Sequence, residues 1–182
     1  MKVEINKSMK LSEHFTLGEL CKTKHVTEDG NIPSHVSIEN LKRICENWLE
    51  DLRYSYNMLY VHSGVRPQSK VAGDCTLAPD PGAAPETEEA IVINSGYRSP
   101  SVNLLAGGAK TSNHLSGCAV DIRCAGKEQM IRYASILVDI ADGTKQDFDE
   151  LLLEQHGNVC WLHFAVRPPS QGNRRKIDFL KG

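Results

Sequence analysis

A histidine and an aspartate seven positions apart, His114 and Asp121, are the residues of this chain best suited to chemistry. They lie in the segment 112–121 (SNHLSGCAVD), and a second histidine, His163, follows in 161–164 (WLHF). Two imidazoles and one carboxylate form the ligand set of a catalytic zinc site, whose fourth position is left to water. Each residue alone is more often structural than a ligand, but together they favour a metal. We therefore predict that His114, Asp121 and His163 bind zinc.

Two predicted strands would hold the last two of these side chains. Residues 118–122 are short, apolar and β-prone, and residues 160–166 form a second candidate strand. Because side chains alternate along a strand, Asp121 should share a face with Ala119, and His163 should lie opposite the apolar residues of its own strand. His114 lies upstream in a polar loop.

A third predicted strand at 149–154 supplies a candidate general base. The polar run 155–158 between this strand and the one at 160–166 indicates a hairpin. That hairpin would bring Glu154 close to His163 across the ladder. A carboxylate beside the water of a metal site is what general-base catalysis needs. We predict this role for Glu154, with His156 as the nearest alternative.

These motifs resemble those of the zinc D-Ala-D-Ala carboxypeptidases and related peptidoglycan-cutting endopeptidases, the peptidase M15 family. The family signature is Ser-x-His-x-x-Gly-x-Ala-x-Asp, followed later by aromatic-x-His. The matching residues here are Ser112, His114, Gly117, Ala119, Asp121, Trp161 and His163. Upstream, 94–99 (NSGYRS) is similar to the family's Ser-Gly-Tyr-Arg-Ser segment, and 11–20 resembles the opening of the phage and bacterial subgroup.

The resemblance implies a fold, a metal and roles for individual residues. The fold would be α+β, a small antiparallel sheet with flanking helices, as in the hedgehog/DD-peptidase group. The cofactor would be Zn²⁺, held by the three residues already named. Glu154 would be the general base and Arg98 would hold a substrate carboxylate or carbonyl oxygen. Several family members place an acid or histidine three or five positions before the last zinc histidine, where this chain has Cys160 and Asn158.

Several roles have alternatives at this stage. Arg98 suits a forked, charge-assisted contact to substrate, or a structural salt bridge to a nearby acid. Ser112 suits a hydrogen bond to substrate, or the capping of its own loop. For the whole protein, the implied activity is hydrolysis of peptidoglycan stem or cross-link peptides. The alternative is a non-catalytic, zinc-stabilised binding module of hedgehog-like fold, although Glu154 and Arg98 argue against it, because a structural site needs neither.

Composition narrows the class of protein further. The chain has 182 residues, enough for one domain over 1–182, and its 21 Lys and Arg against 23 Asp and Glu offer no electrostatic case for nucleic acid. No stretch approaches the ~20 apolar residues of a membrane span, and the first residues lack a signal core. We expect cytoplasmic accumulation, with the cell wall reached after release. The six cysteines are expected to be reduced packing residues rather than zinc ligands.

The remaining elements frame the predicted site. An apolar stripe predicts a helix over 37–53 that starts at Ser34 or Ser37 and includes Trp48 as a packing residue. Ser99-Pro100 should open a short helix that Gly107-Gly108 ends, and Gly126 and Gly143 should bracket a third. Strands are also expected near 90–95 and 175–180. The Gly-, Pro- and Ala-rich insertion at 62–89 is a lid, an oligomer contact or a disordered loop.

Overall fold

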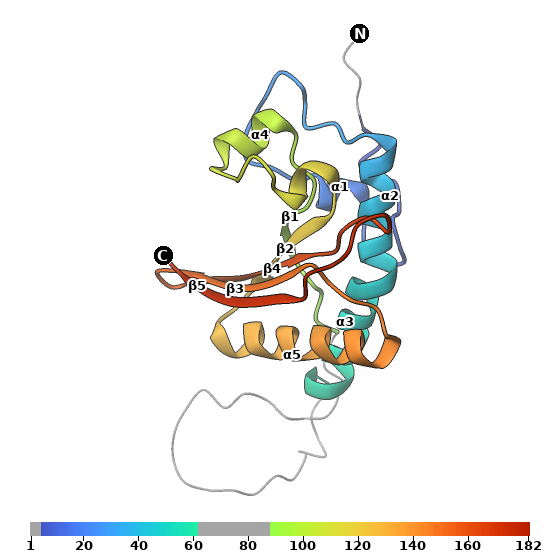
Figure 1. The fold of residues 1–182 in the computed structure, drawn as a ribbon, viewed down its shortest axis with the longest axis vertical. Coiled ribbons are helices and arrows are strands. Elements are labelled where there is room, and N and C mark those ends of the chain that lie inside the picture. The colour runs from blue at the N-terminus through green and yellow to red at the C-terminus, as the bar shows by residue number, and fades with distance from the viewer. Residues whose placement is uncertain (1–4, 62–87) are drawn as a thin grey trace, which may run out of the picture.

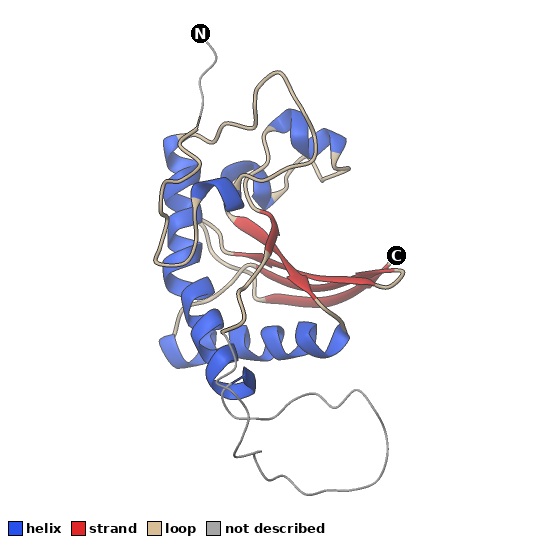
Figure 2. Ribbon diagram, turned by 180° about the vertical axis from the view of Figure 1, so that it is seen from behind, coloured by secondary structure: helices blue, strands red, loops and turns tan. Residues whose placement is uncertain are grey.

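The computed structural model describes residues 5–61 and 88–182, and it places a five-stranded sheet between helices (Figures 1 and 2). The strand order is β1-β2-β4-β3-β5. The strands are β1 (Ile93–Ser95), β2 (Ala119–Cys124), β3 (Glu150–His156), β4 (Val159–Ala165) and β5 (Lys176–Lys181). The predicted α+β class is confirmed, and each expected strand forms near its predicted position. Of the predicted insertion at 62–89, residues 62–87 lie outside the described residues.

The sheet differs from the prediction in one respect, because it is mixed rather than antiparallel. Strand β5 pairs parallel to β3, with Lys176 beside Glu150, while the other pairs are antiparallel. The connection from β4 returns to the beginning of β3, where Arg174 donates to the Asp149 carboxylate and the Lys176 N–H donates to the Asp149 carbonyl at 3.0 Å. Because the returning chain is anchored there, β5 can only run in the same direction as β3.

Helix α5 (Lys127–Thr144) covers one face of the sheet (Figure 1). It starts after Gly126, as predicted. Gly143 does not end it, however: the helix continues through Gly143, and Lys145 takes the left-handed conformation, with φ of 58°. A glycine inside a helix costs backbone entropy but breaks no hydrogen bond, so neighbouring contacts can carry a helix past it.

The helix predicted at 37–53 is longer than its apolar stripe indicated. It runs from α2 (His35–Ile44) through a π-helical turn at Cys45–Leu49 into α3 (Glu50–Tyr56), and a second π turn follows at Asn57–Val61. The Ser34 hydroxyl caps its start by accepting from the Ser37 N–H at 3.1 Å. Trp48 is fully buried against Phe164 of β4, with ring centroids 5.0 Å apart, which confirms its packing role.

The opposite face of the sheet is approached by short elements. These are α1 (Leu17–Leu20), α4 (Pro100–Leu105) and the 3₁₀ helix η3 (Asn113–Ser116). Ser99 caps α4 and Pro100 opens it, as the sequence predicted. In Figure 1, α4 and η3 lie across the sheet from α5. Among the helices of the described ranges, none is both long and apolar enough to cross a membrane.

Candidate metal centre

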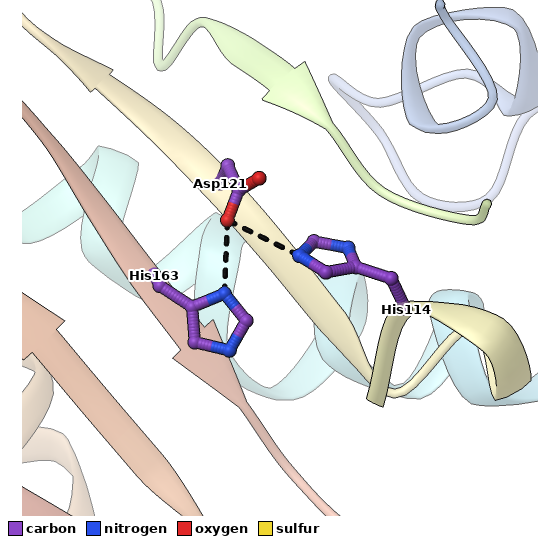
Figure 3. Close-up of side chains that lie close together, drawn as sticks. All are labelled: His114, Asp121 and His163. Atoms are coloured by element: carbon purple, nitrogen blue, oxygen red, sulfur yellow. Dashed lines mark hydrogen bonds and ion pairs between the residues drawn. The ribbon is translucent and has the colours of Figure 1, made fainter. Parts of the chain in front are cut away.

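Three side chains from separate elements converge on one point above the sheet (Figure 3). His114 Nε2 lies 3.2 Å and His163 Nδ1 lies 2.9 Å from the same oxygen, Asp121 Oδ1. One possible ligand atom from each residue lies within 4.8 Å of the others. All three residues are buried. The structure therefore brings together the three residues that the sequence predicted as metal ligands.

The sheet register places two of these residues. Asp121 on β2 and His163 on β4 are direct cross-strand partners, so their side chains leave the same face side by side. His114 is supplied by η3, and Gly117 turns the chain from η3 into β2 with φ of +70°. A Cβ at Gly117 would lie 2.4 Å from the Ser37 carbonyl oxygen, so both the conformation and the space require glycine.

His114 is oriented by the backbone of a distant segment. Its Nδ1 lies 2.6 Å from the Gly96 carbonyl oxygen, which can only accept, so the proton of the ring lies on Nδ1. Gly96 itself packs so closely on α1 that a Cβ would lie 2.3 Å from the Leu20 carbonyl oxygen, and the next residue, Tyr97, donates to that oxygen at 2.7 Å. The opening segment of the chain thereby fixes the carbonyl that holds His114.

This donor set fits a zinc ion. With its proton on Nδ1, His114 turns the lone pair of Nε2 toward the Asp121 carboxylate, which is also an acceptor. Two acceptors at 3.2 Å require a proton or a cation between them. Metal-bound histidines characteristically donate their other ring N–H to a carbonyl or carboxylate, which is the arrangement of His114. Two imidazoles and a carboxylate also match the borderline-soft character of zinc.

The charges of the site hold Asp121 ionised. Burial opposes ionisation, but His114 and His163 keep the pKa of the Asp121 carboxyl well below its usual range. For His163, burial would lower the pKa, but Asp121 and Glu150 raise it to about 9. The Asp121 carboxylate is therefore the acceptor on which the positive charge of its neighbours converges.

Arg98 lies directly against the predicted ligand Asp121. Its Nη2 pairs with Asp121 Oδ2, the oxygen that the histidines do not share, and its Nε donates to the Ser95 hydroxyl at 2.8 Å. This is the geometry of the structural ion pair that was one alternative for Arg98. Arg98 also lines the cleft over the site, where a substrate oxygen could reach it.

Glu154 faces the same cleft from β3. Its cross-strand partner on β4 is Trp161 and its partner on β5 is Leu180, so two apolar side chains flank the carboxylate. Burial raises the pKa of Glu154, and the nearby His163 opposes that rise. His163 itself pairs with Leu152, one row away along the strands. The predicted hairpin is therefore present, with Glu154 diagonal to His163 rather than opposite it.

Glu150, which the sequence reasoning did not select, stands closer to His163. Its Oε2 lies 3.8 Å from His163 Nε2, the nitrogen on the far side of the ring from Asp121. Asn113 donates to the same oxygen at 3.3 Å, and Arg174 contacts the other oxygen at 3.1 Å. Glu150 thus stands where it can orient the His163 ring. The available signal was its position four residues before Glu154, on the same strand face.

Asp149 pairs with several of the polar residues that surround the site. Its side chain is fully buried and is paired with Arg167 at 2.9 Å and with Arg174 at 2.7 Å. Asn113, next to His114 in the motif, also donates to Asp149 at 3.0 Å. Burial opposes its ionisation, but Arg174 and Asn113 lower the pKa of Asp149. The end of the chain is thereby tied to the segment that carries His114.

The cleft over these residues has a volume of about 670 Å³. One wall comes from the small residues between α4 and η3, and the floor comes from the sheet. Ser112 lines the cleft, but its hydroxyl accepts from the His114 N–H at 3.3 Å and caps η3, which was the second of its two expected roles. Cys124 and Cys160 are cross-strand partners buried in the core beneath the sheet, away from the predicted metal ligands.

Comparison with known proteins finds a family-level similarity over part of the chain. A family model described as Peptidase M15 matches residues 85–150. The matched segment contains Arg98, His114 and Asp121 and ends at Glu150, so Glu154 and His163 lie beyond it. A search of curated proteins finds no match.

Proposed function

We propose, on the premise that this chain belongs to the peptidase M15 family, that it is a zinc metallopeptidase acting on peptidoglycan stem or cross-link peptides. The family assignment supports a peptidase. The observation that carries the proposed zinc dependence is the convergence of His114, Asp121 and His163 on one point within a cleft. The presence of Glu154 in the same cleft supports a catalytic rather than a structural metal.

The roles follow from where each group stands. When bound, zinc polarises the scissile carbonyl and lowers the pKa of its water towards ~7. The Glu154 carboxylate takes the proton of the attacking water and passes it to the leaving amine. Burial raises the pKa of the Glu154 carboxyl, which suits a base that must also act as an acid.

Arg98 has two contributions in this proposal. Its ion pair with Asp121 holds the carboxylate in place, and its guanidinium borders the cleft where negative charge develops on the carbonyl oxygen during hydrolysis. Ser112 completes the wall beside it. The proposed substrates are peptides, so we expect Arg98 to contact either that oxygen or a peptide carboxylate.

The metal is tested by elemental analysis of protein purified without chelator. We expect about one zinc per chain, lost in Asp121→Ala, because that variant removes the oxygen on which both histidines converge. Chelation should abolish hydrolysis and added zinc should restore it. Zinc-free protein that gains none on reconstitution would refute the metal site.

The activity is tested by digesting purified muropeptides and identifying the fragments by mass spectrometry. New amino and carboxyl termini within the stem or cross-link peptides are the expected result. Stoichiometric zinc without any product would favour the alternative, a zinc-stabilised binding module of hedgehog-like fold.

A further inference from the structure

The cleft continues past Glu154, away from the predicted metal ligands. A second cavity of about 470 Å³ shares Glu154, Trp161 and Leu180 with the main cleft. It extends along the β3–β4 hairpin to His156 and along β5 to Lys181. The two hollows therefore adjoin along one face, with the three shared residues at their common border.

These shared residues form a single row across the sheet. Trp161 on β4, Glu154 on β3 and Leu180 on β5 are register partners, so their side chains leave the same face of neighbouring strands. Neighbouring strands lie about 4.8 Å apart, so the two apolar side chains stand about 10 Å from each other, with the carboxylate between them. Leu180 is 41% exposed on the edge strand.

The row on the other side of the ligands has a different chemistry. There, Glu150 pairs across the sheet with Ala165 and with Lys176, and Arg174 contacts the Glu150 carboxylate. The cleft is thus charged on one side of His163 and apolar on the other. Single exposed leucines are ordinary on protein surfaces. An exposed leucine and a half-buried tryptophan flanking a candidate base, at the junction of two cavities, are a more specific arrangement.

We propose that Trp161 and Leu180 form an apolar subsite that binds a methyl- or methylene-bearing residue of the substrate beyond the scissile bond. The inference rests on the proposed function and narrows it. Cleft lining continues on both sides of the predicted ligands, so a peptide can extend in both directions from the bond that is cut. The protein is then an endopeptidase that prefers cross-linked or extended peptides to short stem peptides.

The test compares wild type with Leu180→Ser on two substrates, a cross-linked muropeptide dimer and a monomeric stem peptide. We expect kcat/KM for the dimer to fall about tenfold, mainly through KM, because an apolar contact is lost. The kcat/KM value for the monomer should fall clearly less than the value for the dimer, because the lost contact lies beyond a short substrate. Ile177→Ser is the matched control: Ile177 is 49% exposed on the same edge strand but lines neither cavity.

A binding measurement separates this inference from the proposed function. The chain has two tryptophans, so Trp48→Phe leaves Trp161 as the remaining one. In a Trp48→Phe, Glu154→Gln background, the dimer should change the Trp161 fluorescence, and Leu180→Ser should weaken that binding about tenfold.

Each outcome decides between the two proposals. If the dimer binds through Leu180 but wild type cleaves nothing, the subsite stands and the peptidase proposal fails. Equal losses on dimer and monomer, no loss on either, or cleavage of monomers alone would overturn the subsite while leaving the peptidase intact. If the dimer neither binds nor is cleaved, both proposals fall.

Discussion

The two faces of the sheet use the same strands for opposite purposes. On the face toward α5, Leu162 and Phe164 are fully buried among apolar neighbours. On the other face, the alternating residues of the same strand, Trp161 and His163, line a polar cleft with Glu154. Apolar packing stabilises the first face. The second face carries ion pairs and hydrogen bonds that centre on the Asp121 carboxylate.

The difference shows how stability and chemistry are separated within one strand. A side chain on the α5 face contributes area removed from water, and its loss leaves a cavity. A side chain on the cleft face contributes charge or a lone pair, and its loss changes reactivity more than folding. Each substitution below tests one side of this comparison.

The largest effect should come from Phe164→Ala. Phe164 is fully buried, with ring centroids 5.0 Å from Trp48 and 5.8 Å from Phe148. We expect the free energy of unfolding to fall by ~3–5 kcal/mol in urea titrations. Zinc content per folded molecule should not change. Val159→Ala is the control, since Val159 is 61% exposed on the same strand and should change stability by ~0.5 kcal/mol or less. A loss of under ~1 kcal/mol for Phe164→Ala would contradict the packing account.

Glu154→Gln should come next, with an effect on catalysis alone. We expect hydrolysis of muropeptides to slow by ~10²-fold or more, because the proposed general base is removed. Zinc content and the urea midpoint should stay close to wild type. If the rate is unchanged, Glu154 is not the base, and His156→Ala becomes the variant to measure.

Glu150→Gln should lower the affinity of the site for zinc without lowering the stability of the fold. Glu150 stands 3.8 Å from His163 Nε2 and can hold the ring in place, and such partners typically affect metal affinity by ~10–100-fold. Competition with a chromophoric chelator measures the change directly. Glu128→Gln is the control, because Glu128 is exposed on α5 and pairs with Arg132. Unchanged zinc affinity would show that Glu150 serves only its pairs with Arg174 and Asn113.

Arg98→Lys should have the smallest effect. Lysine keeps the positive charge beside Asp121 but lacks the planar fork that contacts Asp121 and Ser95 together. Losing one charged hydrogen bond should reduce kcat/KM about tenfold while zinc is retained. A large drop in the melting temperature, with normal activity per folded molecule, would assign Arg98 a purely structural role.

Alternation along the strands made much of this arrangement predictable. The apolar residues of 118–122 and 160–166 indicated two strands, one carrying Asp121 and the other carrying His163. The helix starts at Ser34 and Ser99 followed from local capping. The base was harder to identify. Glu150 and Glu154 share a strand face and are both diagonal to His163 in the register, and only the side-chain positions bring Glu150 within 3.8 Å of that ring.

Local sequence determined the elements and the types of the candidate ligands, because periodicity, caps and the chemistry of imidazole and carboxylate act over a few residues. Tertiary structure decided what depends on distant contacts. The parallel course of β5 follows from the anchoring of Arg174 at Asp149, 25 positions away in the chain. The orientation of His114 follows from the Gly96 carbonyl, which the opening segment holds in place. No local pattern encodes these partners, since they meet only when the sheet forms.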